Sequence, residues 1–424
     1  MNESGGLVLP RLELRRFGVV LALFLLSMIT YIDRTNISTA KDPIAAELNL
    51  SDVEMGMVFS SFALGYAVMQ LPTGWLVDTV GPRAALAGAV GLWSVLTALT
   101  GIAWNYHSLL AIRFLFGAGE AAVFPSSARA IRNWLLPAQR GRANGALFAG
   151  SRLGAALSYP LVAGMLGLWS WRLAFLLLGL GGLIWTAGWL IWFRDHPVEN
   201  RMRDQKETVA REDGVASGAW ITAPLGLAML QYFASNFTNF VCLTWMLPYL
   251  KTQYQLSTSH AAIYSMAPLL LGATAQGVAG SMVDRIYGSR LRPWSRRLPA
   301  MIGFSLAAIG LAGVTQAHSI DSAVIAFSLA IFGADMTVSP SWVFCTDVSG
   351  ARTGRVSGAM NMCGSIGALV SASAFPFLQH KTGTSSAYFS IAALLDVAGI
   401  LCWLGMRSLG PIATGRTSYL TEAS

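Results

Sequence analysis

Four ionisable side chains stand out because they lie inside long apolar segments of the chain. Asp33 and Arg34 are adjacent in one segment, and Arg113 and Glu120 lie in another, with Gly117 on the same helical face. A charge placed at mid-bilayer costs roughly 2.5–3.5 kcal/mol on insertion scales, so such residues are functional candidates. A carboxylate there can exchange a proton, and a guanidinium can hold an anionic group. We expect two acid–arginine pairs across a central cavity; a structural salt-bridge network is the alternative.

One more arginine and two more acids lie in comparable segments. Arg152 has no acid nearby in sequence, so its partner is either Glu120 or Asp33, or a carboxylate of a ligand. Asp335 is a candidate for a third protonatable site, whereas Asp396 is expected to be a lone acid at the edge of the bundle. The five histidines fall in loops or at segment ends and no lysine lies inside a segment, so a carboxylate must carry any proton.

The composition shows what kind of element positions these residues. Of the 424 residues, 54% are hydrophobic and only 12% are charged, and the mean hydropathy is +0.53, whereas soluble domains carry about 25% charged residues. A helix needs about 20 apolar residues to cross the hydrocarbon core. The sequence therefore predicts an all-α membrane protein with twelve transmembrane helices, at residues 17–38, 53–76, 83–104, 108–132, 142–166, 172–194, 222–250, 258–283, 298–317, 322–346, 354–378 and 386–407.

The basic residues are distributed unevenly between the loops. One alternate set of loops holds most of the arginines, whereas the opposite set holds only Lys41, Arg172, Lys251 and Lys381. The positive-inside rule then places both termini in the cytoplasm. This distribution explains the net charge of +8 without a nucleic-acid partner. The first apolar run is too long for a cleavable signal peptide and lacks a small-residue cleavage site.

The chain divides into two halves that resemble each other. Residues 195–218 are polar and carry charges of both signs, as expected of a linker. We expect an N-terminal six-helix bundle at 1–194, a cytoplasmic linker at 195–219, a C-terminal six-helix bundle at 220–410 and a cytoplasmic tail at 411–424. The sequence GWLVDTVGPR begins at residue 74, and a related GSMVDRIYGSR begins at 280, which is 206 residues later. Many secondary transporters are built from such a repeated unit.

The first copy of this motif resembles a family signature. Gly74, Asp78, Gly81 and Arg83 are similar to the loop between spans 2 and 3 of the major facilitator superfamily, with Thr79 where arginine is frequent in the family. The resemblance implies that this gating loop latches the state open to the outside. In physical terms, the glycines allow close helix approach, and the aspartate can cap a helix N-terminus and pair with an arginine.

Two further patterns narrow the resemblance. Two patterns resemble the anion:cation symporter branch of this superfamily: YIDRTN, from Tyr31 to Asn36, and the set from Arg113 to Glu120. This branch contains bacterial transporters of galactonate, hexuronates and glucarate, phthalate permeases, and relatives of sialin and the vesicular glutamate transporters. The resemblance implies that Asp33 and Glu120 are proton sites and that Arg34 holds substrate. It also implies a bacterial inner membrane as the location.

Other candidate substrate contacts are mostly neutral. Tyr66 and Gln70 match the family pattern Tyr-x3-Gln-x-Pro-x-Gly, in which the tyrosine faces the substrate. A hydroxylated anion needs donors, acceptors and an aromatic wall. The candidate substrate contacts in the first half also include Arg34, Arg113 and Arg152. Those in the second half are Asn239, Ser341, Trp342 and Asn361. Each of these polar residues is alternatively a helix–helix contact.

These observations favour proton-coupled symport of an organic anion, such as an aldonate, hexuronate or aldarate. The alternatives are a permease for phthalate-type or tartrate-type anions, a proton-coupled efflux transporter, and a membrane sensor without transport. No nucleophile–base pair, phosphate loop or metal-spaced set of ligands is present in the sequence, so we expect neither an enzyme nor a cofactor beyond the proton gradient. The expected partners are the anion, protons and lipid, and the expected state is a monomer.

Overall fold

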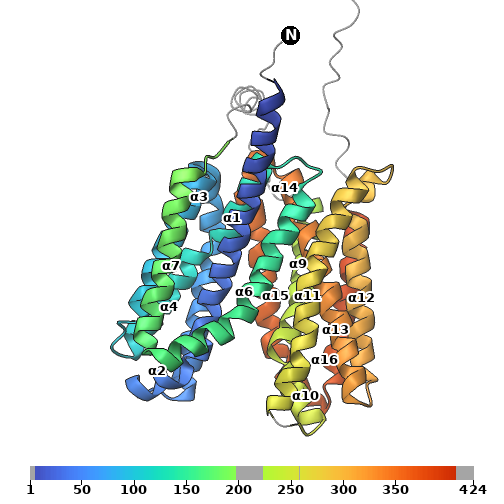
Figure 1. The fold of residues 1–424 in the computed structure, drawn as a ribbon. Helices are drawn as coiled ribbons and strands as arrows, with labels where there is room; N and C mark the ends of the chain where they lie inside the picture. Colours follow the sequence, from blue (N-terminus) through green and yellow to red (C-terminus); the bar gives the residue numbers. More distant parts are fainter. Residues whose placement is uncertain (1–4, 197–222, 257, 407–424) are drawn as a thin grey trace, which may run out of the picture.

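A computed structural model describes residues 5–196, 223–256 and 258–406 as helices joined by short turns (Figure 1). The first half contains α1 (Gly5–Thr39), α2 (Lys41–Leu48), α3 (Asp52–Thr100), α4 (Tyr106–Glu120), α5 (Val123–Trp134), α6 (Arg140–Leu168) and α7 (Trp171–Trp192). The second half contains α9 (Ala223–Thr244), α10 (Met246–Gln253), α11 (Thr258–Tyr287), α12 (Arg297–Thr315), α13 (Ile320–Met336), α14 (Val338–Val348), α15 (Thr353–Thr382) and α16 (Ser386–Gly405). Short 3-10 turns lie at Arg292–Trp294 and Gly350–Arg352.

The helices account for twelve membrane crossings. Nine described stretches are long and apolar enough to span a bilayer. One of them, Glu54–Thr100, crosses twice because its helix breaks at Gly81, and α6 and α9 bring the number to twelve. Gly81 has φ 81° and ψ 162°, a conformation that favours glycine, and Pro82 then starts the next helix. The boundaries of the linker and tail stay predictions, because residues 197–222 and 407–424 lie outside the described part.

Three of the expected spans are interrupted rather than continuous. The helix pairs α4 and α5, α9 and α10, and α13 and α14 each occupy one expected span. In every pair the second helix has a proline at its third position, at Pro125, Pro248 and Pro340. A proline has no N–H for the carbonyl four residues earlier, so the helix ladder is broken at the junction. Apolar length alone could not locate these breaks.

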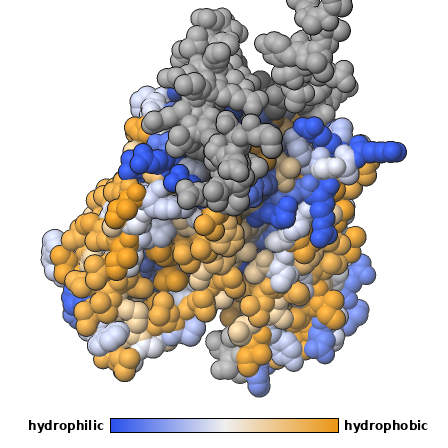
Figure 2. Space-filling view, turned by 45° about the horizontal axis from the view of Figure 1, so that its top comes forward, coloured by the Kyte–Doolittle hydropathy of each residue, from blue (hydrophilic) through white to orange (hydrophobic). Residues whose placement is uncertain are grey.

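The two halves approach each other at one end, here called the basic end, where α1, α6, α12 and α15 begin. In Figure 1 the ribbons of the halves diverge toward the other end, which carries α2 and α10. Helix α6 packs against α11, and α3 packs against α15. In Figure 2 hydrophilic residues gather toward the basic end, and hydrophobic residues cover the flanks of the bundle.

Aspartates from both motif copies close the basic end. The backbone amides of Gly354 and Arg355 donate hydrogen bonds to Asp78 at 2.7 and 2.9 Å, and Arg129 and Arg355 lie 3.5 and 3.6 Å from the same carboxylate. Asp78 belongs to the first half, and Gly354 opens α15 in the second. The contact therefore joins the halves at a helix N-terminus, where a negative charge is stabilised.

The second copy repeats this contact in the opposite direction. Asp284, near the end of α11, accepts hydrogen bonds from the amides of Gly141 and Arg142 at 2.8 and 2.9 Å. These amides lie in the first turn of α6, in the first half. The two latches are thus related by the same pseudo-symmetry that relates the motifs.

Arg83, another residue of the gating loop, makes its contacts within the first half. The amide of Arg83 donates to Asp195 at 2.7 Å, and its guanidinium donates to the carbonyl of Leu190. Arg83 therefore joins the start of the third span to the end of α7 and does not bind Asp78.

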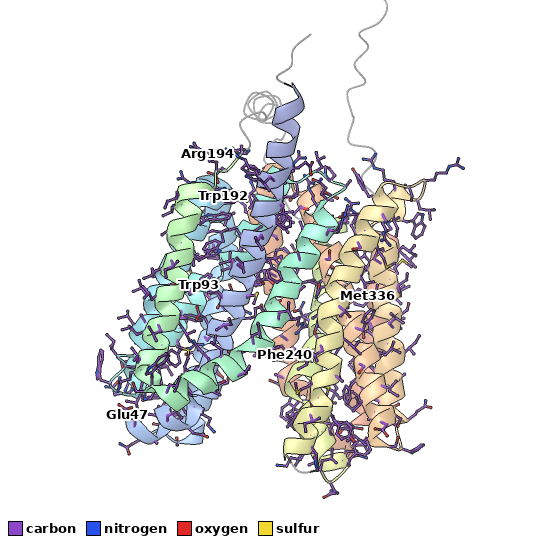
Figure 3. The ribbon with its side chains drawn as sticks, in the orientation of Figure 1. Glu47, Trp93, Trp192, Arg194, Phe240 and Met336 are labelled. Atoms are coloured by element: carbon purple, nitrogen blue, oxygen red, sulfur yellow. The ribbon has the colours of Figure 1, made fainter. Side chains whose placement is uncertain are left out.

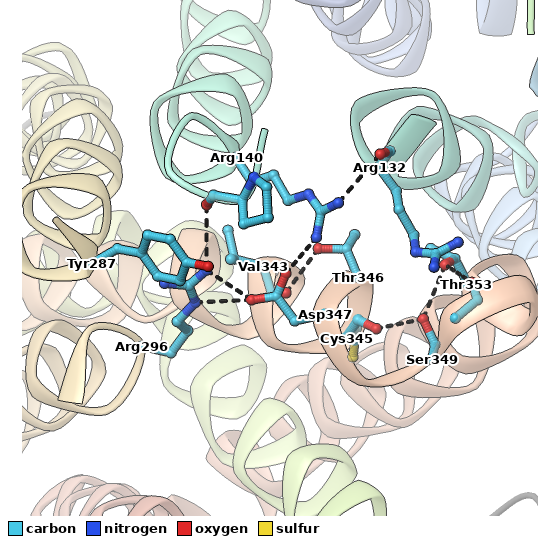
Figure 4. A network of polar contacts seen from close by, with 12 residues as sticks. Arg132, Arg140, Tyr287, Arg296, Val343, Cys345, Thr346, Asp347, Ser349 and Thr353 are labelled. Carbon is cyan, nitrogen blue, oxygen red and sulfur yellow. Dashed lines mark hydrogen bonds and ion pairs between the residues drawn. The ribbon is translucent and has the colours of Figure 1, made fainter. Parts of the chain in front are cut away.

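A further ion-pair network joins the halves near these latches (Figure 4). Asp347 of α14 accepts from Arg140 of α6 at 2.5 Å and from Arg296, next to α12, at 2.7 Å. Arg296 also donates to the carbonyl of Pro137 at 3.3 Å. Closure of the basic end thus depends on several charge-assisted contacts in addition to the two latches.

Candidate functional site

An ion pair between α1 and α4 lies at the centre of the first half. Arg34 donates from Nε to Oε1 of Glu120. Glu120 is fully buried, whereas 19% of the Arg34 side chain is exposed. Glu120 is the last residue of α4, immediately before the interruption of that span. The pair therefore consists of a buried acid and a cation that is partly open to its surroundings.

Aromatic rings surround the Arg34 guanidinium. Its carbon lies 4.5 Å from the ring centre of Tyr66, 4.9 Å from that of Tyr31 and 5.4 Å from that of Phe62. Rings within about 6 Å attract a cation through their electron-rich faces. These aromatic contacts help to hold the Arg34 guanidinium in place.

Asp33 faces a different environment from its neighbour Arg34. Its carboxylate accepts a hydrogen bond from Nε1 of Trp93 at 3.1 Å, and the residue is 1% exposed. Trp93 lies at mid-height of the first half (Figure 3). Within the described residues no cation lies within 4.0 Å of Asp33, so the expectation of two acid–arginine ion pairs was wrong. Adjacent residues on a helix point about 100° apart, and only Arg34 points toward Glu120.

Arg113 is buried without an ion pair among the described residues. It is 1% exposed, and its guanidinium carbon lies 4.4 Å from the ring centre of Phe116 and 5.4 Å from that of Phe62. Its Nε and Nη1 have no hydrogen-bond partner in the described part of the chain. The ring of Phe62 is therefore close to two guanidinium groups, those of Arg34 and Arg113.

Two hydrogen bonds connect this region to the second half. The amide of Asn361 donates to the Tyr66 hydroxyl at 2.9 Å, and the amide of Gln70 donates to Ser365 at 2.9 Å. The two helices run antiparallel here, because Gly354 lies against Gly74 and Gly358 lies against Gln70. The structure thus brings the predicted residues Tyr66, Gln70 and Asn361 together across the boundary between the halves.

Arg152 has its partner in the second half. Its guanidinium donates to both carboxylate oxygens of Asp335, at 2.6 and 3.1 Å, and to the amide oxygen of Asn239 at 2.7 Å. Gln276 and Asn239 donate to the same carboxylate at 3.2 and 3.1 Å. The predicted partners Glu120 and Asp33 were wrong, because sequence distance conceals an acid that is 183 residues away.

Two other predicted residues of the second half, Ser341 and Trp342, make hydrogen bonds within that half. Ser341 exchanges hydrogen bonds with Gln231, and Trp342 donates to the Tyr232 hydroxyl at 2.9 Å. Both Ser341 and Trp342 are fully buried. Their hydrogen bonds are helix–helix contacts of the second half, and the Trp342 ring also lies 5.9 Å from that of Phe124 and 5.5 Å from that of Phe148 in the first half.

Asp396 has no cation partner in the described part of the chain, as expected of a lone acid, but it is not at the bundle edge. It is fully buried between α16 and α9, and the Thr238 hydroxyl lies 3.0 Å from both carboxylate oxygens. Hydropathy marks a segment as apolar but does not show which face of the helix is covered.

The sequence and fold comparisons identify the protein family. A family model described as Major Facilitator Superfamily matches residues 23–372. The chain belongs to the major facilitator superfamily. It is 32% identical over 397 residues to a probable sulfoacetate transporter of Cupriavidus necator, covering 91% of this chain and 92% of the relative. It is 31% identical over 394 residues to the hexuronate transporter of Bacillus subtilis, covering 89% and 92%.

Further relatives and solved structures agree with this family. A probable L-galactonate transporter of Escherichia coli is 28% identical over 397 residues, covering 91% of this chain and 88% of the relative. The fold resembles a proton:xylose symporter (TM-score 0.73, 15% identity, 92% and 96% covered) and the human organic anion transporter MFSD10 (TM-score 0.72, 18% identity, 92% and 99% covered).

Membership in the superfamily confirms several expectations. The all-α fold of two six-helix halves is confirmed, and the relatives confirm the resemblance to the sugar-acid branch. The protein is a multi-pass membrane transporter and not an enzyme, and the sensor alternative is thereby excluded.

Sequence reasoning missed the neighbours that hold these charges. Trp93 was not singled out, and the bond between Arg152 and Asp335 was not foreseen, although both residues were noted separately. The available signal was the shared depth of the two residues in spans 5 and 10. In this superfamily transporter, charged residues that lie at a similar depth in spans of opposite halves are therefore candidates for ion pairs with each other.

Proposed function

We propose that this protein is a proton-coupled symporter that imports a small organic anion, of the sugar-acid type, across the bacterial inner membrane. The ion pair between Arg34 and Glu120 carries the proposal. A buried carboxylate and an incoming acid group would compete for one guanidinium, so protonation of Glu120 would release Arg34 for the anion. The names of the relatives, which include hexuronate and galactonate transporters, support the substrate class.

The proposed orientation places the basic end and both termini in the cytoplasm. Arg140, Arg296 and Arg355 lie at this end, as the positive-inside rule requires of a cytoplasmic face. Since the latches close this end, the site would be entered from the outside in the present conformation. The monomeric state and the cytoplasmic linker belong to the same proposal.

The proposed cycle begins with proton uptake from outside. Protonation of Glu120 neutralises the partner of Arg34, whose guanidinium stays between the rings of Tyr31, Phe62 and Tyr66. The acid group of the anion then takes the place of the Glu120 carboxylate. Asn361 reaches Tyr66 from the second half, so a ligand at this point would contact both halves.

Release would follow the opposite order. The halves rock, the latches of Asp78 and Asp284 separate, and the site faces the cytoplasm. Loss of the proton from Glu120 restores the ion pair with Arg34 and expels the anion. Asp33, which has Trp93 as its donor, would take up a second proton in the same cycle.

The experiment is uptake into proteoliposomes under an imposed pH gradient. Wild-type protein is expected to accumulate labelled D-glucuronate, whereas Glu120→Gln is expected to exchange it without pH-driven accumulation. Asp321→Asn is the matched control, because this acid is exposed at the start of α13. If Glu120→Gln accumulated the anion as well as the wild type does, Glu120 would not couple protons to transport.

A further inference from the structure

The contact between Arg152 and Asp335 crosses the boundary between the halves. Arg152 lies on α6 of the first half, and Asp335, Asn239 and Gln276 lie on three helices of the second half. The side chain of Arg152 is 12% exposed and that of Asp335 is 1% exposed. When the halves rock apart here, a largely buried guanidinium loses its carboxylate and needs another anionic partner.

Asp335 occupies a position in the second half that corresponds to Glu120 in the first. Glu120 ends α4, and Asp335 is the penultimate residue of α13, so each lies just before the interruption of its span. These are the fourth span of each half. Each acid binds an arginine, Arg34 or Arg152, and in transporters such broken helices flank the ligand site.

An aromatic cluster lies close to Arg34 and includes a residue one turn from Arg152 on α6. The Arg34 guanidinium is 6.0 Å from the ring centre of Phe124, which stacks on Phe148 at 5.3 Å, and Trp342 lies 5.5 Å from Phe148. Phe148 precedes Arg152 by one turn of α6. Phe124, Phe148 and Trp342 therefore form one buried aromatic cluster, with Arg34 beside Phe124 and Arg152 one turn along α6 from Phe148.

The packing of α1 against α6 gives the separation of these cations. Ser158 donates to the carbonyl of Ile32 at 3.3 Å, and Gly154 packs against Met28, so the helices run parallel with a constant offset. Arg152 is six residues before Ser158, and Arg34 is two residues after Ile32. The backbones of the two arginines are thus about 12 Å apart along the bundle, and both are long, flexible side chains.

We propose that Arg152 is a second anion-binding group and that the substrate is a small dianion, with two acid groups joined by a short hydroxylated chain. The inference rests on the proposed function and adds the substrate class. One acid group binds Arg34 in place of Glu120, and the other binds Arg152 in place of Asp335. Glu120 and Asp335 therefore remain paired with the two arginines until the ligand binds.

The charges of the cluster agree with a dianion. Arg34 is paired with Glu120 and Arg152 with Asp335, so two positive groups balance two negative ones. Protonation of Glu120 and Asp335 would leave Arg34 and Arg152 without a negative partner, and a dianion would restore neutrality at these two groups. A monoanion would leave one buried charge without a partner, which is costly.

The test compares two anions that differ only in the second acid group, D-glucarate and D-gluconate. Initial uptake of each is measured in proteoliposomes containing wild-type protein, Arg152→Gln, or Arg152→Gln/Asp335→Asn. The double variant removes both buried charges, so it leaves no unpaired ion. Arg290→Gln, which removes an exposed arginine, is the matched control.

The expected result is a preference of the wild type and of Arg290→Gln for D-glucarate of at least about tenfold, roughly 1.4 kcal/mol. In the double variant this ratio should fall toward one, whether or not total uptake also falls. A wild-type preference for D-gluconate, or an unchanged ratio in the double variant, would overturn the inference while leaving anion symport intact. Failure of the wild type to accumulate any organic anion under a pH gradient would instead overturn the proposed function.

Discussion

Asp78 and Asp284, 206 residues apart in the chain, each cap the first turn of a helix in the opposite half. Asp78 accepts two backbone amides of α15, and Asp284 accepts two of α6. Because each carboxylate meets its helix only when the halves are closed at the basic end, the pair stabilises one conformation of the transport cycle.

Replacing these carboxylates should favour opening of the basic end. A lost cap costs about 1 kcal/mol, so each of Asp78→Asn and Asp284→Asn should shift the equilibrium between conformations by roughly fivefold. Distances between spin labels at exposed Thr79 and Ser289 report the shift. Asp195→Asn is the control, because Asp195 binds Arg83 within the same half. An equal shift in the control would show that a general loosening is measured.

A glycine contact at the same end is sensitive to one added carbon. A Cβ on Gly74 would lie 2.5 Å from the carbonyl oxygen of Gly354, whereas a Cβ on Gly88, in the span after the break at Gly81, would meet nothing within 4 Å. Gly74→Ala is therefore expected to prevent full closure, and Gly88→Ala to leave closure unchanged. The spin-label distances and uptake rates of the two variants test this. Wild-type closure in Gly74→Ala would contradict the observed packing.

Arg34 should not be replaceable by lysine. An ammonium keeps the charge but loses the planar fork that matches a carboxylate and the flat contact with Tyr31 and Tyr66. We expect Arg34→Lys to raise the KM for the anion by roughly tenfold, about 1.4 kcal/mol. Uptake kinetics at saturating and limiting anion concentrations give KM. A wild-type KM would mean that charge alone suffices at this position.

The opposite end of the bundle contains a pH-sensitive contact outside the spans. Arg172 donates to Glu47 at 2.8 Å and Trp171 donates at 2.5 Å, and these hydrogen bonds hold the pKa of the Glu47 carboxyl below its ordinary value. Figure 3 shows Glu47 at this end, far from Arg194. A lowered pKa in the folded state contributes stability above the ordinary pKa, and this contribution disappears as the pH falls through the lowered value.

Glu47→Gln should therefore lower Tm at neutral pH and lose this effect in acid. Thermal unfolding of both proteins between pH 7 and pH 3 measures the difference. Because Glu47 is exposed, 1 M salt should reduce the difference at neutral pH. A Tm difference that persisted below the lowered pKa would show that the charge of Glu47 is not its cause.

The sequence by itself determined the membrane spans of this protein and the candidate functional residues inside them. Apolar runs of sufficient length predict helical spans, because backbone N–H and C=O groups must all be hydrogen-bonded within the hydrocarbon core. Charges inside those runs marked Asp33, Arg34, Arg113 and Glu120, since an intramembrane charge is retained only where it is used or paired. The duplicated motif likewise indicated that the two halves share a repeated unit.

Only the tertiary structure decided which charges meet. Asp33 and Arg34 are neighbours in the chain, yet one faces Trp93 and the other Glu120, because helix geometry turns adjacent side chains apart. Arg152 meets Asp335 from the other half of the protein. Periodicity orients a side chain on its own helix, but the packing of one half against the other selects its partner, and that packing depends on contacts between residues far apart in sequence.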